Sequence, residues 1–203
     1  MYTVTINQRD RGAGDRVPEL LRALARQRPD VPFDRTVGDE AQAVFTDPAA
    51  ALDAALTALR PDACGGVRWN VGIGVGRVDK PLPLGVAEAR GPALARSRRA
   101  VERAQATGEG PAIAVDGPDA SLAHDAEGVL RLLGLAVVKR TAAEWRVLDL
   151  LTPGVRGQQK AVADALGITT QAVSKAIARA HWTEEWAARP AAVRLLGLLD
   201  ATG

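Results

Sequence analysis

The sequence of 203 residues contains a single cysteine, Cys64, and only two histidines, His124 and His181. A lone cysteine cannot form a disulfide within the chain, which favours a reducing compartment such as the cytoplasm. So few thiols and imidazoles also exclude a thiolate-based or histidine-rich zinc site. The sequence therefore predicts neither a bound metal nor a cofactor.

Long apolar runs are missing as well. Apolar residues make up 47% of the chain, yet no stretch approaches the roughly 20 residues that cross a bilayer. The opening residues MYTVTINQRD contain neither a basic leader nor an apolar targeting segment. We expect a cytoplasmic protein without a membrane partner, long enough for one or two domains with a sizeable core.

A strong charge of either sign is also absent, since the net charge is only +2. The small basic excess lies in residues 140–203, whereas the rest of the chain is balanced. Within 155–182 the basic residues are Arg156, Lys160, Lys175 and Arg179. A patch of this size fits a modest nucleic-acid footprint, but it also fits an ordinary solvated face, and charge alone leaves both open.

Apolar periodicity and turn residues predict the order β-α-β-β-α-β-α-β for the first part of the chain. The expected elements are a strand at 2–8, a helix ending at Pro29, two paired strands over 33–45, a helix from Asp47-Pro48, a strand at 67–78, a helix from Gly91-Pro92 to about Gln105, and a strand in PAIAVD. The first six elements are those of a split βαβ, ferredoxin-like sheet. Glycines Gly72, Gly74 and Gly76 lie in a strand, where they predict close backbone approach rather than a dinucleotide-binding loop.

The segment DGPDAS (116–121) is typical of a linker, and helical spacing prevails beyond it. We expect an α+β domain at 1–118, a connecting helix at 119–139 and an all-α domain at 140–203. A capping box, Thr141-x-x-Glu144, is expected to open the first helix of that last domain. The final segment, TEEWAARPAAVRLLGLLD, has more apolar residues than a small three-helix unit covers, so it either packs within its domain or forms a dimer contact.

Residues 159–178, QKAVADALGITTQAVSKAIA, match a helix-turn-helix position by position. Val162 and Leu166 lie one turn apart on the first helix, and Gly167 stands where the turn needs a positive φ. Ile168 is expected in the core beneath the turn. Val173 and Ile177 then bury the inner face of the second helix. The alternatives are a plain helical hairpin and a helix-turn-helix used for protein contact.

The residues left on the outside are hydrogen-bonding or cationic, which suits base edges and phosphates in double-stranded DNA. The predicted DNA-binding residues are Thr170, Gln171, Ser174, Lys175, Arg179 and, on the first helix, Lys160. The stretch ALGITTQAVSKAIARA resembles the DNA-binding segment of many bacterial regulators, including the sigma-region-4, LuxR-type and MarR-type groups. The resemblance implies a transcription regulator that acts as a homodimer.

The turn Gly38-Asp39-Glu40 is either a site for a metal and a phosphate or an ordinary hairpin tip. With the strand VRWNVGIGVGRV and the helix after Gly91, the hairpin GDEAQAVF resembles the class III nucleotidyl cyclase and diguanylate cyclase folds over about residues 1–116. The chain is more similar still to SatD-like bacterial proteins, some of which also end in a helix-turn-helix. The resemblance implies a cyclase-like domain at the N-terminal side.

Cyclase chemistry needs one carboxylate at the end of the first strand and one on the hairpin, which together hold two divalent ions. Asp39 fits the hairpin position. The strand position falls on Asn7 or Gln8, neither of which is anionic, and Asp10 is a poor substitute.

The family also uses an asparagine and an arginine to stabilise the transferring phosphate. By spacing from Gly91 these positions fall on Ala95 and Arg99, so only the arginine is kept. We therefore expect a chain that is not an enzyme.

Ligand binding on this fold is a separate hypothesis from catalysis. Its candidate residues are Asp39, Glu40, Arg96 and Arg99, and a small nucleotide is the ligand to expect. The alternative is that the arginines of 96–103 form a solvated or dimer face with Glu102.

The sequence as a whole predicts a cytoplasmic, nucleoid-associated bacterial DNA-binding regulator with a catalytically degenerate cyclase-like sensory or dimerisation domain. The alternatives are a nucleotide-processing enzyme with an accessory DNA-binding tail and a dimeric scaffold that senses nothing.

Overall fold

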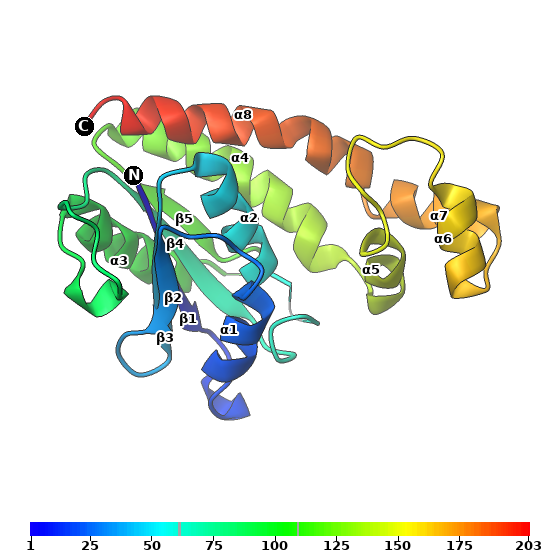
Figure 1. The fold of residues 1–203 in the computed structure, drawn as a ribbon, viewed down its shortest axis with the longest axis horizontal. Coiled ribbons are helices and arrows are strands. Elements are labelled where there is room, and N and C mark those ends of the chain that lie inside the picture. Colours follow the sequence, from blue (N-terminus) through cyan, green and yellow to red (C-terminus); the bar gives the residue numbers. More distant parts are fainter. Residues whose placement is uncertain (61, 109) are drawn as a thin grey trace.

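The computed structural model describes residues 1–60, 62–108 and 110–203, and over these ranges the chain is a mixed α+β protein with one five-stranded sheet and eight α-helices (Figure 1). The strands are β1 (Tyr2–Gln8), β2 (Val31–Arg35), β3 (Glu40–Phe45), β4 (Trp69–Val75) and β5 (Ile113–Asp116). The helices are α1 (Val17–Leu24), α2 (Pro48–Ala58), α3 (Pro92–Gln105), α4 (Ala120–Lys139), α5 (Ala142–Leu148), α6 (Gln159–Leu166), α7 (Thr170–Arg179) and α8 (Trp182–Asp200), with 3₁₀ turns η1 (Arg11–Ala13) and η2 (Val86–Glu88).

The sheet has the order β2-β3-β1-β4-β5. Strand β1 is antiparallel to both of its neighbours, β2 is antiparallel to β3, and only β5 runs parallel to its neighbour β4. The turn between β2 and β3 contains Gly38, which takes the positive φ of 60° that the turn requires. Strand β2 is at the edge of the sheet and Glu40 of β3 lies opposite Asn7, so the hairpin tip lies next to the end of β1.

Helix α3 covers one face of the sheet and approaches it closely. A Cβ added to Gly72 or Gly74 of β4 would lie 2.3 and 2.1 Å from backbone oxygens of α3, so no side chain fits at either position. The predicted close backbone approach is confirmed at Gly72 and Gly74, whereas Gly76 lies just beyond β4 and a Cβ there would first meet the Arg96 side chain. Thr5 on β1 donates a hydrogen bond to Ser97 of α3 at 2.7 Å, which satisfies both hydroxyls in this tight layer.

The opposite face carries the main core, which α1, α2, α4 and α8 cover together. Figure 1 shows the long helices α4 and α8 side by side and running in opposite directions. Leu196 and Leu199 of α8 are fully buried in this core. The two roles expected for the last segment were packing within residues 140–203 and a dimer contact; these leucines take neither, because they are buried in the core beneath the sheet. Over the described ranges, no helix is both long and apolar enough to cross a membrane.

The two chain ends meet beside β5. The Met1 amino group pairs with Asp200 at the end of α8, and a Cβ added to Gly117 would lie 2.6 Å from the side chain of Leu199. The predicted linker 116–121 is instead the end of β5 and the start of α4, where Asp119 caps the helix by accepting from Ser121 and Leu122. Residues 140–203 are thus joined to the sheet along α8 as well as through α4.

Candidate functional site

Helices α5, α6 and α7 form a small unit at the far end of α4 and α8 from the chain termini (Figure 1). The capping box that opens α5 is confirmed: Thr141 accepts from the Glu144 backbone N–H, and Glu144 accepts from the Thr141 backbone N–H at 2.8 Å. The unit has its own apolar cluster, which consists of Val147, Val162, Ala163 and Val173 with Leu151, Leu166, Ala176 and Ile177 packed around it. The face of α7 that was predicted to point inward, with Val173 and Ile177, is therefore the face that packs on this cluster.

The connection between α6 and α7 is three residues long, and its first residue takes the left-handed conformation. Gly167 has φ 65° and ψ 34° at the end of α6, and the Thr169 hydroxyl accepts from the Ala172 backbone N–H at 3.1 Å to cap α7. The prediction that Ile168 fills the core is wrong, because its side chain is 40% exposed. It lines a cleft of about 450 Å³ between α5 and α7 instead.

The outer face of α7 carries most of the predicted DNA-binding residues. Thr170, Gln171, Lys175 and Arg179 are exposed, as is Lys160 on α6. Ser174 is half-buried, and its hydroxyl bridges to the Thr170 carbonyl at 3.0 Å and the Gln159 side chain at 3.1 Å. Among the described residues, Gln171 and Lys175 have no side-chain hydrogen bond or ion pair within the chain, so both are available to a partner.

Arg179 is exposed but restrained by α5. Its guanidinium lies 3.5 Å from the Glu144 carboxylate. The backbone N–H of Thr141, with its hydroxyl and the Arg179 charge, holds the pKa of Glu144 below its ordinary value. The Glu144 charge is therefore maintained near neutral pH, and Arg179 is held against α5 at the end of the exposed face.

The hairpin tip is organised by Glu40 rather than by Asp39. The Glu40 carboxylate accepts from the Thr36 hydroxyl at 2.6 Å and lies 3.9 Å from Arg98. Glu40 also pairs across the sheet with Asn7, whose side chain accepts a hydrogen bond from Asn70 at 2.8 Å. The end of β1 on this face is thus polar but uncharged.

Gln8 and Asp10, the other residues near the end of β1, are occupied by structural contacts. Gln8 donates to the carbonyls of Asp10 and Gly14 and accepts from the Arg16 backbone N–H, so it braces the β1–α1 connection. Arg68 donates to Asp10 from its side chain at 2.7 Å and from its backbone, which holds the pKa of Asp10 below its ordinary value. Over the described residues no three His, Cys, Asp or Glu side chains gather closely enough to hold a metal ion.

Three of the four arginines of α3 have their partners away from the hairpin. Arg96 donates to the Val75 carbonyl at 2.9 Å, Arg99 pairs with Asp116 at 2.9 Å, and Arg103 pairs with Glu127 at 2.9 Å. All three partners lie toward the β4–β5 side of the sheet. Arg98, which the sequence interpretation left out of the ligand-binding set, is the arginine that approaches Glu40.

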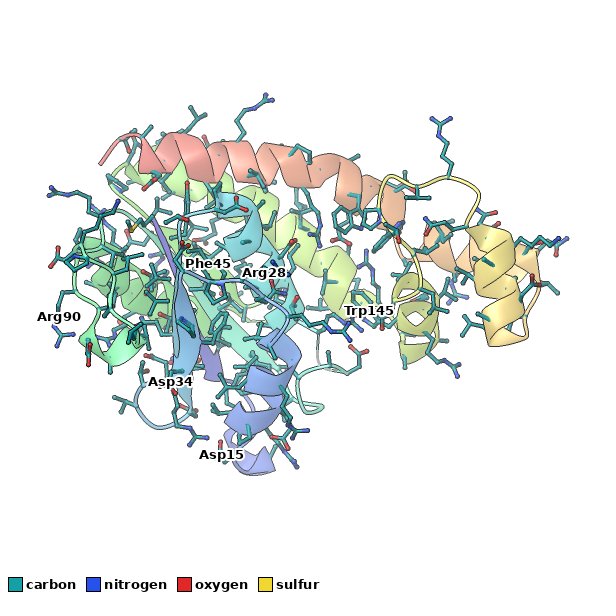
Figure 2. The ribbon with its side chains drawn as sticks, in the orientation of Figure 1. Asp15, Arg28, Asp34, Phe45, Arg90 and Trp145 are labelled. Atoms are coloured by element: carbon teal, nitrogen blue, oxygen red, sulfur yellow. The ribbon has the colours of Figure 1, made fainter. Side chains whose placement is uncertain are left out.

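A second group of polar and aromatic residues, not assigned as a site from the sequence, lies where α2, α4, α5 and α8 meet. Figure 2 labels one member, Trp145, where α4 gives way to α5. Arg60 lies 3.5 Å above the Trp145 ring, and Arg140 lies 4.8 Å from it. Three of the four tryptophans of the chain fall between 145 and 186, and that clustering was the one sequence signal for this group.

No protein-family model matches this sequence, and neither the curated proteins nor the solved structures contain a match.

Proposed function

We propose that the chain is a DNA-binding transcription regulator in which α6 and α7 form a helix-turn-helix and α7 contacts the major groove. The observation that carries this proposal is the exposed pair Gln171 and Lys175 on a helix whose opposite face is buried by Val173. A three-residue turn with a left-handed glycine joins α7 to α6, as in the DNA-binding motif. Glutamine suits a bidentate contact to adenine, and lysine suits guanine or a phosphate.

The front part is proposed to be a ferredoxin-like, cyclase-like domain that senses a ligand or dimerises. The antiparallel order β2-β3-β1-β4, with α1 and α2 on one face, is the arrangement of a split βαβ sheet and supports this assignment. Catalysis is not part of the proposal, because Asn7 is uncharged while Gln8 and Asp10 are used in holding the chain. Two copies would then place two α7 helices on half-sites about one helical turn of DNA apart.

A selection from randomised duplexes tests the proposal directly. We expect the protein to enrich a pseudo-palindromic sequence and its affinity to fall steeply with salt, since phosphate contacts release counterions. Failure to enrich any sequence would refute the proposed function.

Two variants then test whether α7 is the contacting element. Gln171→Ala should cost roughly 1–3 kcal/mol of binding and relax preference at one base pair, while Lys175→Ala, if it holds a phosphate, should lower the salt slope by about 1. If Lys175 contacts guanine instead, preference at its base pair changes. Matched controls are Gln105→Ala on α3 and Lys80→Ala, both exposed and remote from α7. If the two α7 variants bind the selected site as the controls do, another surface contacts DNA.

A further inference from the structure

The strongest unassigned feature is an apolar face formed by α4 and α8, the two long helices that lie side by side in Figure 1. A groove of about 620 Å³ follows the seam between them on the side away from the core. Leu132 of α4 is 68% exposed and Leu198 of α8 is 50% exposed. Leucines left in water along one continuous groove are typical of a surface that another protein covers.

The residues of this face repeat with the period of a helix that packs into a bundle. On both helices the spacing alternates between three and four residues. The face consists of Asp125, Gly128, Leu132, Leu135 and Lys139 on α4, and of Glu184, Ala188, Ala191, Leu195 and Leu198 on α8. All of them are exposed or half-buried in the described chain. A stripe of each helix about 21 Å long is therefore open to a partner.

The two stripes lie level with each other, because α4 and α8 run in opposite directions. Arg140, just after α4, contacts the Ala180 carbonyl and the Glu185 side chain, which lie on either side of the start of α8. Lys139 and Glu184 are therefore at the same end, and both line the groove. From this end both stripes proceed in steps of four, three, four and three residues, so each position on α4 has a level partner on α8.

The level pairs combine a large and a small side chain. The three middle pairs are Leu135 with Ala188, Leu132 with Ala191, and Leu195 with Gly128. A Cβ added to Gly128 would meet nothing within 4 Å, so the small residue leaves open space at the surface. The face thus presents a leucine beside a hollow at every middle level.

A second copy of the chain has the shape that fills these hollows. When a two-fold axis runs along the helices, each α4 lies against the partner's α8, and neighbouring helices of the resulting four-helix bundle run in opposite directions. Leu132 then faces the partner's Ala191, and each other middle leucine likewise faces a small residue, so the layers interdigitate. A two-fold axis that crosses the helices would instead set Leu132 against the partner's Leu132 and alanine against alanine, which packs unevenly.

The charges at the end near α7 agree with the same arrangement. Lys139 and Glu184 are exposed, and neither forms an ion pair among the described residues. With the axis along the helices, Lys139 faces the partner's Glu184 and Glu184 faces the partner's Lys139, so both contacts are attractive and hold the register. We propose that the α4–α8 face is the homodimer interface of this protein, with each α4 packed against the partner's α8.

This interface also orients the helix-turn-helix units, and this step rests on the proposed function. In each copy the α5–α7 unit lies beyond Lys139, at the end of the helix pair away from the chain termini (Figure 1). An axis along the helices places both units at the same end of the dimer. The two α7 helices then face one side of a duplex together, as a pseudo-palindromic site requires.

Sedimentation of the full chain over a series of concentrations measures the dimer without DNA. We expect the wild type to dimerise, and Leu132→Glu should raise the dissociation constant at least about a hundredfold, because it places two carboxylates in the apolar seam. Leu84→Glu is the matched control, since Leu84 is 95% exposed in the loop before η2, and it should leave the dissociation constant unchanged. A wild type that stays monomeric, or a Leu132→Glu variant that dimerises like the control, would overturn the proposal and leave the face to a different partner.

Charge reversal tests which helices face each other. Lys139→Glu leaves only acidic groups at that level of a homodimer, and Glu184→Lys leaves only basic ones, so each variant alone should dimerise at least about tenfold more weakly than the wild type. In an equal mixture the acidic level of one chain meets the basic level of the other, so heterodimers should exceed both homodimers. Native mass spectrometry counts the species when one variant carries an added tag. A statistical mixture would refute the pairing of α4 with the partner's α8.

Neither measurement contains DNA. A failure of the dimer interface is therefore distinguishable from a failure of the proposed function, which the selection from randomised duplexes tests.

Discussion

Among the polar contacts of the described chain, the ion pair between Arg140 and Glu185 is predicted to cost the most unfolding free energy when one partner is replaced. Arg140 lies just after α4, and Glu185 lies in the first turn of α8. The guanidinium also donates to the Ala180 carbonyl at 2.9 Å, so it ties the end of α4 to the connection between α7 and α8. Both charged side chains are almost completely buried, and a buried charge that loses its partner is strongly destabilising.

The expected magnitudes follow from the remaining contacts. In Arg140→Met, Glu185 keeps Arg189 as a partner, so the cost should fall at the low end of the range for a broken buried pair, roughly 3 kcal/mol. Glu185→Leu removes the partner of two arginines and should cost roughly 4 kcal/mol. The double variant leaves no unpaired buried charge at Arg140, so it should cost no more than Glu185→Leu alone, about 4 kcal/mol, instead of the sum of about 7 kcal/mol, which is a coupling of at least about 3 kcal/mol.

Urea unfolding followed by circular dichroism measures these free energies, provided that the unfolding free energy of every variant falls with urea concentration at the same slope. Arg131→Met is the matched control. Arg131 lies 3.8 Å from Glu127 on the surface of α4, and its loss should cost less than about 0.5 kcal/mol. A double variant whose cost equals the sum of the two single variants, or an Arg140→Met cost no larger than that of the control, would refute the argument from burial.

Three further outcomes are expected. Gly74→Ala places a Cβ 2.1 Å from an α3 backbone oxygen and should lower the unfolding free energy by roughly 3 kcal/mol or more. Gly197→Ala in α8 meets nothing within 4 Å and should raise it by up to about 1 kcal/mol. Equal melting temperatures for the two variants would contradict this. Gly167→Ala should cost about 1 kcal/mol and Gly167→Asn less, because φ is 65°; equal melting temperatures would argue against strain at the turn. Arg68 lowers the folded pKa of Asp10 below 3.8, so the Asp10 carboxylate stabilises the fold fully above that pH, and this stabilisation is lost as the pH falls through the folded pKa. The difference in unfolding free energy between the wild type and Asp10→Asn, measured by urea unfolding at several pH values, should therefore disappear in acid.

Much of the secondary structure could be predicted because its signals are local. The strand at 2–8, the helix that starts after Asp47 and the helix from Pro92 to Gln105 agree with β1, α2 and α3. The cap at Asp47 accepts from the backbone N–H of Ala49 two residues on, so the whole interaction is contained in a short stretch of sequence. Period and cap together specify such elements without reference to tertiary contacts.

The partners of charged side chains could not be predicted in the same way. Arg99 pairs with Asp116, and Arg140 pairs with a glutamate 45 residues further on. Helical spacing identifies neighbours three or four residues apart, but it does not say which side of α3 faces β5 or where α8 returns. The prediction that Ile168 is buried was wrong for a related reason. Its burial depends on the width of the cleft between α5 and α7, which the motif does not specify.

The position of the α5–α7 unit relative to the sheet is set by helix packing rather than by a flexible linker. The unit lies between the end of α4 and the start of α8, and these two helices pack against each other along their length (Figure 1). Arg60, just beyond α2, stacks on Trp145 and pairs with Asp149, so the sheet part also contacts the unit directly. The contact between the sheet part and the α5–α7 unit is therefore made by packed and paired side chains, with Arg60 touching two residues of the unit at once.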